Sequence, residues 1–295
     1  MAKKPDCWPE DVVDRESFIQ LVWEHGDALY RDLPWRGIDD PYAVLVSEIM
    51  LQQTQVARVE RFWTRFLSSF PTIDALASAS TSDVLEHWQG LGYNRRALAL
   101  KRAADICSSE CAGQLPSDYD GLIALPGVGP ATAAGVMAFA YRKPAVYIET
   151  NVRSVFIHHL FPGEDKVSDK ILAPCVEACC PPEGEVLGRD VRAWYYALLD
   201  YGSHLKSTGE NPSRKSAHYA RQSTFEGSRR QKRAWIVRRV LADPDGVERK
   251  VVMAELSAYE LSCGRDAVDD ALFASIVKDL INEGFFRNVG SLLLP

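Results

Sequence analysis

The sequence lacks any apolar run long enough to span a membrane, and no apolar core of a signal peptide follows Met1 to Asp6. It also lacks an excess of positive charge, because 34 Lys and Arg stand against 40 Asp and Glu, giving a formal net charge of −6. These absences argue against a membrane or secreted protein, and the total charge alone disfavours a nucleic-acid partner. We predict an intracellular protein of the cytoplasm or nucleoid, with no membrane partner.

Cysteine is scarce and unevenly placed. The chain has 7 cysteines, an odd number that fits reduced thiols, and none lies between Cys180 and Cys263. Cys107 and Cys111 are at helical spacing, and a metal site shared with the cysteines at 175–180 is an alternative. Neither a Cys-x-x-Cys pair nor a nearby His supports that site, so we predict no bound metal.

The composition is that of an ordinary globular protein, with 46% hydrophobic and 25% charged residues in 295 positions. A chain of this length suggests more than one domain. Its basic residues gather between Lys206 and Arg239, where 10 basic residues against 2 acidic ones give +8. An acidic protein with one such basic face can still bind a DNA duplex.

A glycine turn, Leu125 to Gly129, joins two helical patterns near the middle of the chain. Its two glycines can take positive φ and leave backbone N–H groups uncovered at the start of the next helix, where a phosphate can bind. Most such turns only connect helices, which is the alternative. About twenty residues later an apolar run, 145–148, ends at Glu149 to Asn151, where another helical pattern begins.

A second carboxylate, Glu48, lies on the helix that Asp40 and Pro41 are suited to begin. Its neighbours on the same helical face, Val44, Leu45 and Leu51, are apolar. An acid in such surroundings holds its proton more tightly than in water and suits general acid catalysis near neutral pH. The alternative is a Glu at the helix edge that extends to solvent.

These motifs, in this order, carry a resemblance to a known family. LPGVG followed by a carboxylate at a helix start resembles the helix-hairpin-helix (HhH-GPD) DNA glycosylases. The stretch 47–56, SEIMLQQTQV, is similar to the mismatch-specific adenine glycosylases in particular, as are 33–36, LPWR, and 90–93, GLGY. The resemblance covers roughly residues 15 to 205. It implies DNA with a mismatch or lesion as partner, bound by a monomer.

The resemblance also implies roles for individual residues. The catalytic group would be Glu48, Glu149 and Asn151, and the pocket for the extruded base would be Trp35, Arg36 and Leu51. Gln53 and Tyr93 would enter the duplex, and the hairpin residues Gly127, Val128 and Gly129 would bind phosphate. Without the family, Trp35 and Arg36 are equally well explained as a core Trp and a surface Arg.

Four departures from the family pattern affect these expectations. Glu149 stands in place of an Asp, and Asn94 in place of an aromatic residue common in adenine-excising members. Ala131 occupies the position of the lysine nucleophile found in glycosylases that also cut the backbone, so we predict no lyase activity. The four cysteine ligands of the family's iron–sulfur cluster are missing, so we predict no cofactor.

A basic segment stands where the cluster would be. We predict that Arg214, Lys215, Arg229 and Arg230 supply phosphate contacts in its place, the alternative being a solvated linker. Residues 231–295 show three helical patterns and a terminal hairpin, typical of a winged helix. The third of these helices is acidic, so we expect a structural or protein-binding role for it.

The predicted fold is all-α, a two-lobed helix-hairpin-helix glycosylase with a small C-terminal winged-helix-like domain. The glycosylase domain spans 10–230, with a six-helix lobe over about 38–145 and a second lobe from 10–37 and 146–230. The predicted function is a monofunctional DNA glycosylase that flips a mispaired or damaged base and hydrolyses its N-glycosidic bond. Adenine opposite guanine or 8-oxoguanine is the first choice, thymine or uracil the alternative. A non-catalytic mismatch-binding protein is the alternative of another class.

Overall fold

The computed structural model describes residues 8–186, 188–209, 211–220 and 224–295. Helices dominate these residues, which confirms the all-α fold class. The chain divides into two compact units, and the division falls within one helix, α2 (Pro41–Leu51). Unit 1 contains 1–49 and 115–221, and unit 2 contains 50–114 and 222–295. The predicted lobes were drawn along other lines, with 115–145 in the first lobe, and they stay a prediction.

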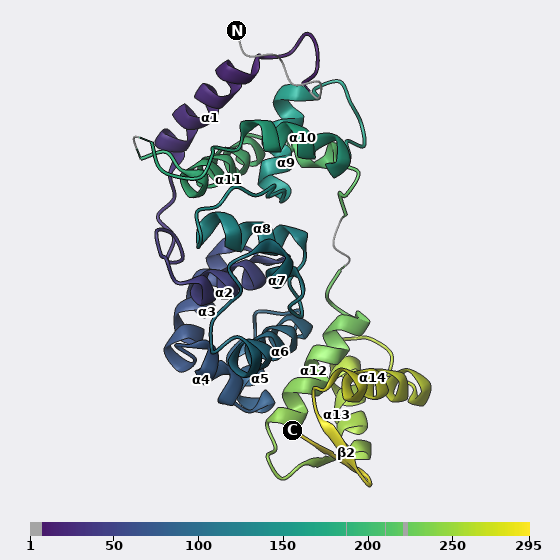
Figure 1. The fold of residues 1–295 in the computed structure, drawn as a ribbon. Helices are drawn as coiled ribbons and strands as arrows, with labels where there is room; N and C mark the ends of the chain where they lie inside the picture. The colour runs from purple at the N-terminus through teal and green to yellow at the C-terminus, as the bar shows by residue number, and fades with distance from the viewer. Residues whose placement is uncertain (1–7, 187, 210, 221–223) are drawn as a thin grey trace. The chain divides into compact units, whose positions relative to one another are not determined.

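Unit 1 is built around the buried helix α11 (Val191–Ser207), which packs against α1 (Arg15–Leu29) and α9 (Thr150–Leu160) (Figure 1). The remaining elements of this unit, besides the start of α2, are α7 (Tyr119–Ile123), α8 (Pro130–Phe139), α10 (Asp169–Cys179) and the 3₁₀ helix η1 (Pro212–Lys215). Helices α1 and α11 approach so closely that a Cβ at Gly26 would lie 2.3 Å from the Cβ of Ala197.

Side chains cap the first two helices of unit 1, and the predicted helix start at Asp40 and Pro41 is confirmed. The side chain of Asp14 accepts hydrogen bonds from Glu16 N and Ser17 N at the start of α1. At the start of α2, Asp40 accepts from Tyr42 N at 2.9 Å, and Pro41 is the first helical residue. Both caps satisfy N–H groups that have no partner within the helix.

Unit 2 begins with four helices around an aromatic core. They are α3 (Val56–Ser69), α4 (Ile73–Ser78), α5 (Thr81–Trp88) and α6 (Arg95–Glu110). Phe66 packs against Phe70 and Trp88, with ring centroids 4.9 and 5.7 Å apart. Trp63 is also buried.

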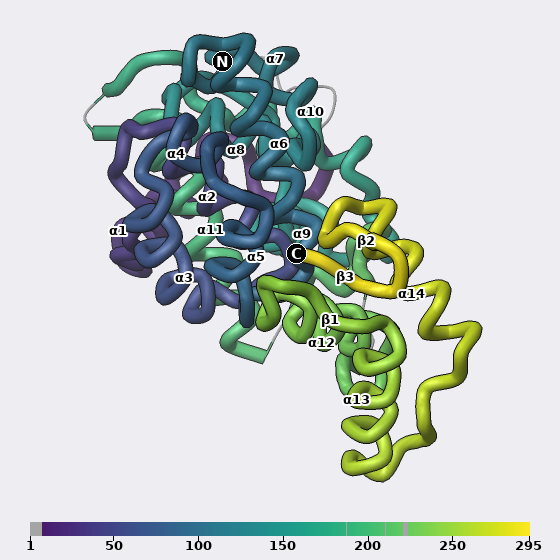
Figure 2. Tube along the Cα trace, turned by 90° about the horizontal axis from the view of Figure 1, so that it is seen from below, coloured from purple at the N-terminus to yellow at the C-terminus, as the bar shows by residue number. Residues whose placement is uncertain are grey.

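The C-terminal part of unit 2 has three helices and a small sheet, gathered together in both views (Figures 1 and 2). The helices are α12 (Arg229–Leu241), α13 (Arg249–Ser262) and α14 (Asp270–Glu283). The strands are β1 (Val247–Glu248), β2 (Arg287–Val289) and β3 (Leu292–Leu294), antiparallel in the order β1-β3-β2. The three helices and the hairpin were predicted and β1 was not, while the winged-helix assignment stays a prediction.

Acidic side chains of α14 are paired with basic ones elsewhere in unit 2. Asp279 accepts from Arg229 at 2.6 Å, and Glu283 from Arg95 and Arg233 at 2.5 and 2.6 Å. These ion pairs within unit 2 therefore account for acidic residues that make α14 unsuited to a DNA major groove. Within the part of the chain that the structure describes, no helix is both long and apolar enough to cross a membrane.

Candidate active site and DNA-contact residues

Glu48 lies on α2 with its carboxyl group against α8. A Cβ at Gly135 would be 2.3 Å from Glu48 Oε2 and 3.0 Å from Tyr147 Cε2, so only glycine leaves room for both side chains. The Tyr147 phenol is buried and forms a hydrogen bond with the Glu48 carboxyl group. Glu48 itself is half-buried. The sequence therefore places this acid in an apolar notch whose floor is a glycine.

The surroundings of Glu48 raise its pKa to about 8. Burial is the largest cause, because it disfavours the charged form, and the negative charge of Glu149 adds to it. The hydrogen bond from Tyr147 acts in the opposite direction and lowers the pKa. Glu48 is thus mostly protonated at neutral pH, the state that a general acid needs.

Glu149 is the N-cap of α9. Its Oε1 accepts hydrogen bonds from Asn151 N at 2.5 Å and from Val152 N at 3.2 Å. Burial raises the pKa of Glu149 above its ordinary value, and the two backbone bonds and the positive charges of Lys206 and Arg153 offset only part of this rise. The same backbone donors and the positive end of the helix dipole favour its ionised form.

Asn151 is the second residue of the same helix. Among the described residues, its side-chain oxygen is buried and has no hydrogen-bond partner. Helix α11 passes directly over it, because a Cβ at Gly202 would lie 2.2 Å from the Asn151 carbonyl oxygen. A buried acceptor left open in this way is available to a donor on a bound ligand.

Two tyrosines fix the segment that leads to Glu149. The hydroxyl of Tyr195 donates to Ala145 O and accepts from Tyr147 N, the latter at 3.2 Å. The rings of Tyr147 and Tyr195 meet edge to face, with centroids 5.3 Å apart. Sequence reasoning missed Gly135, Tyr147 and Tyr195; of these, only Tyr147 carried a signal, as an aromatic residue two positions before the carboxylate.

Two of the predicted base-pocket residues, Trp35 and Arg36, are buried within unit 1. Trp35 is buried, and Arg36 donates from both Nη atoms to the carboxylate of Asp200 at 2.7 and 2.8 Å. The Arg36 guanidinium also lies 5.1 and 4.4 Å from the ring centroids of Tyr30 and Tyr196. Arg36 therefore forms a buried ion pair with Asp200, and its contact with a base stays a prediction.

Leu51, the third of the predicted pocket residues, is the last residue of α2 and is partly exposed. It belongs to unit 2, whereas Trp35 and Arg36 belong to unit 1. A cavity of about 490 Å³ in unit 1 adjoins Arg36 through Tyr30, Gly37 and Tyr196. Glu48 and Glu149 do not line this cavity.

The two residues predicted to enter the duplex share a rare backbone conformation. Gln53 has φ 55° and Tyr93 has φ 50°, in the left-handed region that residues other than glycine avoid. Gln53 is exposed and Tyr93 is half-buried. The Tyr93 hydroxyl accepts a hydrogen bond from Arg230 of α12 at 2.9 Å, so the C-terminal part of unit 2 contacts this loop.

The glycine turn connects α7 to α8, as the hairpin motif predicts. Gly127 has φ 79° and requires glycine, whereas Gly129 has φ −93° and is the N-cap of α8, with Pro130 at the first helical position. A Cβ at Gly129 would meet nothing within 4 Å, and no side chain caps the helix. Val128 is buried. The helix start has the open N–H groups that phosphate binding needs, although only Gly127 uses positive φ.

The predicted phosphate-binding basic residues differ in what they already bind. Arg229 pairs with Asp279, and Lys215 Nζ donates to Pro162 O at 2.5 Å. Arg214 is exposed on η1, and Arg230 is held at Tyr93. Their phosphate contacts stay a prediction. In the same basic segment, Glu210 and Arg221 lie outside the described residues.

The loop after α11 does not fit an iron–sulfur cluster. The chain has no thiolate between Cys180 and Cys263, and Pro212 and Ser213 fill the position as buried residues of η1. A parallel bridge joins this loop to Val167, which donates to Lys215 O at 2.8 Å. Within the described ranges, no group of three His, Cys, Asp or Glu side chains is placed to hold a metal ion.

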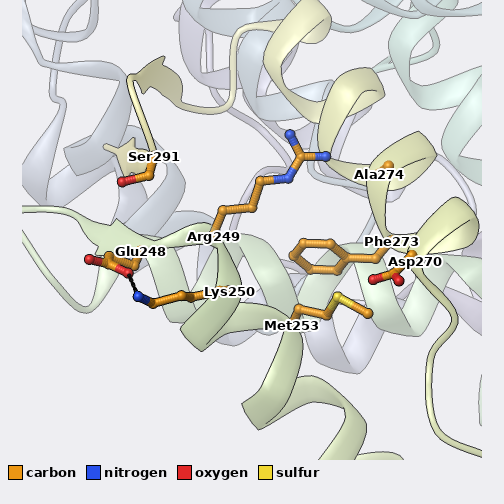
Figure 3. A pocket seen from close by; sticks show the side chains of 8 residues that line it. All are labelled: Glu248, Arg249, Lys250, Met253, Asp270, Phe273, Ala274 and Ser291. Carbon is orange, nitrogen blue, oxygen red and sulfur yellow. Dashed lines mark ion pairs between the residues drawn. The ribbon is translucent and has the colours of Figure 1, made fainter.

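A further cavity, of about 520 Å³, opens in the C-terminal part of unit 2. Figure 3 shows Phe273 and Met253 at its apolar side, with Arg249 and Lys250 beside them. Lys250 pairs with Glu248 at 2.8 Å, and the Arg249 guanidinium lies 5.9 Å from the centre of the Phe273 ring. Its lining gives no indication of one particular occupant.

Comparison with known proteins defines the class first. Residues 46–181 match the family described as HhH-GPD superfamily base excision DNA repair protein. Among curated proteins, the chain is similar to the adenine DNA glycosylases. It is 40% identical to that of Mycolicibacterium smegmatis over 159 residues, covering 53% of this chain and 54% of that protein. It is 47% identical to that of Mycobacterium tuberculosis over 157 residues, 51% of each chain.

The chain therefore spans about half the length of the curated relatives that it matches. Solved structures agree on the fold. A thermostable thymine-DNA glycosylase has a TM-score of 0.55 at 25% identity, covering 64% of this chain and 86% of that one. An endonuclease III trapped in a covalent complex with DNA has a TM-score of 0.50 at 17% identity, covering 65% and 86%.

Proposed function

We propose that this chain is a DNA glycosylase that hydrolyses the N-glycosidic bond of a mispaired base, adenine opposite guanine or 8-oxoguanine above all. The observation that carries the proposal is the pair of carboxyl groups in unit 1. Glu48 is held protonated in the notch at Gly135, and Glu149 is held by backbone donors at the start of α9. A neutral acid beside an ionised carboxylate is the division of labour that hydrolysis of a sugar bond needs.

In the proposed reaction, the bond between the sugar C1′ and the base nitrogen breaks, and its electron pair leaves with the base. Glu48 protonates the departing purine, which makes it a better leaving group. Glu149 stabilises the positive charge that develops on the sugar, and water then adds to C1′ and gives its proton to the ionised Glu48, which restores the acid. The open side-chain oxygen of Asn151 can accept from this water or from the nucleotide.

DNA contacts follow from the loops. We propose that the α8 start at Gly127 to Gly129 binds phosphate, with Gln53 and Tyr93 entering the duplex while the target nucleotide leaves the stack. Arg214 and Lys215 would add phosphate contacts on one side. The protein would act on double-stranded DNA with a mismatch or lesion, as an intracellular monomer.

We further propose that the enzyme is monofunctional and works without an iron–sulfur cluster. Ala131, the second residue of α8, has no amine to attack the sugar, and the loop after α11 has no thiolates. Borohydride treatment during turnover tests the first point, because it traps a covalent enzyme–DNA adduct only where an amine attacks C1′. Iron analysis of the purified protein tests the second.

Removal of thymine or uracil opposite guanine is the second candidate. It is favoured by the 25% identity to a thymine-DNA glycosylase. It is also favoured by Asn94, which replaces the aromatic residue common in adenine-excising members and makes no side-chain cap hydrogen bond at the start of α6. A pyrimidine leaving group depends less on protonation, so Glu48→Gln should slow purine release far more than pyrimidine release. A third possibility, a protein that binds mismatches without cutting, is left open by Glu149 in place of the family's Asp.

A single-turnover excision assay on a panel of duplexes tests all three. The panel carries A, T, U and oxidised or alkylated bases opposite each partner base, with Glu48→Gln and Glu149→Gln as variants. In Glu149→Gln the new amide oxygen keeps an acceptor for the α9 cap, so this variant removes charge and leaves the helix start in place. Matched thermal unfolding of both variants controls for the fold.

Release of adenine, lost in both folded variants, would support the proposed function. Release of a pyrimidine that survives Glu48→Gln would favour the second candidate. Tight and mismatch-selective binding without release of any base would contradict a glycosylase and favour the binding protein.

A further inference from the structure

Gln53 and Tyr93 lie in two separate turns, and the backbone of both residues is strained. Both have positive φ without being glycine, 55° and 50°. Conformations of this kind persist only where surrounding contacts enforce them, and they gather at functional sites. One side chain, that of Arg96 at the start of α6, makes such contacts with both turns.

The Arg96 guanidinium binds backbone carbonyls before Gln53 and a side-chain hydroxyl after it. Its Nη1 donates to Met50 O at 2.8 Å and to Gln52 O at 2.6 Å, and its Nη2 donates to Thr54 Oγ1 at 3.0 Å. The first of these acceptors lies in the last turn of α2, where carbonyl groups lack partners within the helix and a positive charge is favourable.

The same guanidinium also binds the second turn. Nη2 of Arg96 donates to Gly92 O at 3.0 Å, and the backbone N of Arg96 donates to Tyr93 O at 2.9 Å. The Trp88 indole donates to the same Gly92 carbonyl at 3.1 Å. The guanidinium lies 5.5 and 5.4 Å from the ring centroids of Trp88 and Tyr93. The half-buried guanidinium of Arg96 therefore connects the turn at 52–54 with the turn at 92–93 through hydrogen bonds.

We propose that Arg96 is a positioning residue that sets the spacing of Gln53 and Tyr93, so that the two side chains enter the duplex together as one rigid element. The inference rests on the proposed function, because it assigns a cause to the duplex opening that base excision needs. It requires a planar fork, since the guanidinium serves four separate acceptors with fixed geometry. A lysine keeps the charge but reaches fewer of them.

The test measures duplex opening without chemistry. In a Glu48→Gln background, a duplex carries the fluorescent base 2-aminopurine beside the mispaired adenine, and unstacking on binding raises its emission. Arg96→Lys is compared with Arg102→Lys, at an exposed position of the same helix whose side chain forms no hydrogen bond or ion pair with the described residues. Thermal unfolding confirms that each variant is folded.

We expect Arg96→Lys to lower the rate of unstacking about tenfold, because misplacement of contact groups by an ångström is costly. Arg102→Lys should match its parent, and binding of a fully paired duplex should change less than about twofold in both variants. A duplex whose adenine is already unpaired, opposite an abasic site, should largely restore the Arg96→Lys signal. Thr54→Ala, which removes one acceptor and leaves the guanidinium in place, should show a smaller loss of about threefold.

Equal unstacking by parent, Arg96→Lys and Thr54→Ala would overturn this inference and leave the proposed function standing. No unstacking by the parent on any mismatched duplex would overturn the proposed function and this inference with it. If Arg96→Lys does not fold, Thr54→Ala alone decides, and its matching the parent would overturn the inference.

Discussion

The carboxyl group of Glu48 is seated directly on Gly135, so that a methyl group at that glycine would come within 2.3 Å of Glu48 Oε2. Real side-chain carbons do not approach an oxygen so closely, and the Tyr147 ring on the other side leaves little room for movement. A helical glycine that ordinarily weakens a helix thus makes room for the candidate acid.

Gly135→Ala should therefore impair excision more than it impairs folding. We expect the chemical step to slow about a hundredfold as the carboxyl group is displaced. Overpacking should lower the free energy of unfolding by about 1–3 kcal/mol. Single-turnover rates and denaturant unfolding measure the two effects. Gly163→Ala is the control, because a Cβ there meets nothing within 4 Å and its φ is not in the left-handed region. A Gly135→Ala enzyme with normal rates would contradict the seating of Glu48.

The pKa of Glu48 predicts the alkaline side of the pH profile. Because the acid must be protonated, the rate of the chemical step should be level from neutral pH up to its pKa of about 8 and should fall above it, as long as Glu149 stays ionised. Stability should follow the same group. Its folded-state pKa lies above the ordinary 4.5, so the folded state is favoured at low pH and loses that contribution as pH rises through about 8.

Glu48→Gln removes both effects at once. Its thermal midpoint should fall less between pH 6 and pH 9 than that of the parent protein, with Glu10→Gln, an exposed carboxylate, as the control. Parallel loss of stability in parent and Glu48→Gln would mean that Glu48 is not protonated in the folded protein.

Tyr147→Phe should move the alkaline limb of the rate profile to higher pH. The Tyr147 hydrogen bond lowers the pKa of Glu48, so its removal leaves burial and the charge of Glu149 to raise that pKa further. The buried ring stays, and its contact with Tyr195 is kept. The measurement is the single-turnover rate as a function of pH in both proteins. A shift to lower pH would show that the phenol does not donate to this carboxylate.

The candidate carboxylates of this site could be predicted from local sequence motifs. The geometry of the site depends on contacts between residues far apart in the chain. Glu48 and Glu149 could be predicted because each stands at a helical position that its neighbours define, with apolar residues around one and a helix start after the other. Gly135 could not be predicted in this way. Only glycine fits at this position because the side chain of Glu48, 87 positions earlier in the chain, fills the space that a Cβ would need.

The helices were predicted from spacing and caps for the same local reason. The pair Asp40 and Pro41 marks a helix start that the structure confirms. Strand β1 was missed because two residues give no periodicity, and it forms only through pairing with β3. The partner of Arg36 was missed as well, since Asp200 lies on a helix 164 positions away.

Asp200→Asn should destabilise the protein severely. Asp200 is fully buried and serves both Nη atoms of Arg36 and Nε of Arg31. Removal of its charge leaves the buried Arg36 guanidinium uncompensated, at a cost of about 3–5 kcal/mol. Denaturant unfolding measures this, and Asp27→Asn is the matched control because its ion pair with Arg189 is exposed and 3.8 Å long. A loss below about 1 kcal/mol would mean that Arg36 is free to serve a base instead.

Gln53→Gly should separate stability from duplex opening. The left-handed backbone at Gln53 costs a residue with a Cβ about 1–2 kcal/mol, which glycine does not incur. Glycine loses about 0.5–1 kcal/mol of this gain to the greater freedom of the unfolded chain. The variant should therefore be as stable as the parent or slightly more so, although it has lost the side chain that we propose enters the duplex.

The two quantities are measured on one preparation. Denaturant unfolding should give a free energy no lower than that of the parent, while 2-aminopurine unstacking should fall about tenfold, as a loss of about 1.4 kcal/mol of interaction with the opened duplex would produce. Gln55→Gly, at an exposed residue with φ −67°, is the control and should lose stability. A destabilised Gln53→Gly that still opens the duplex would show that the left-handed turn serves folding and that the glutamine does not act on DNA. A variant that is stable and inactive would show that the strain at this position is maintained for function.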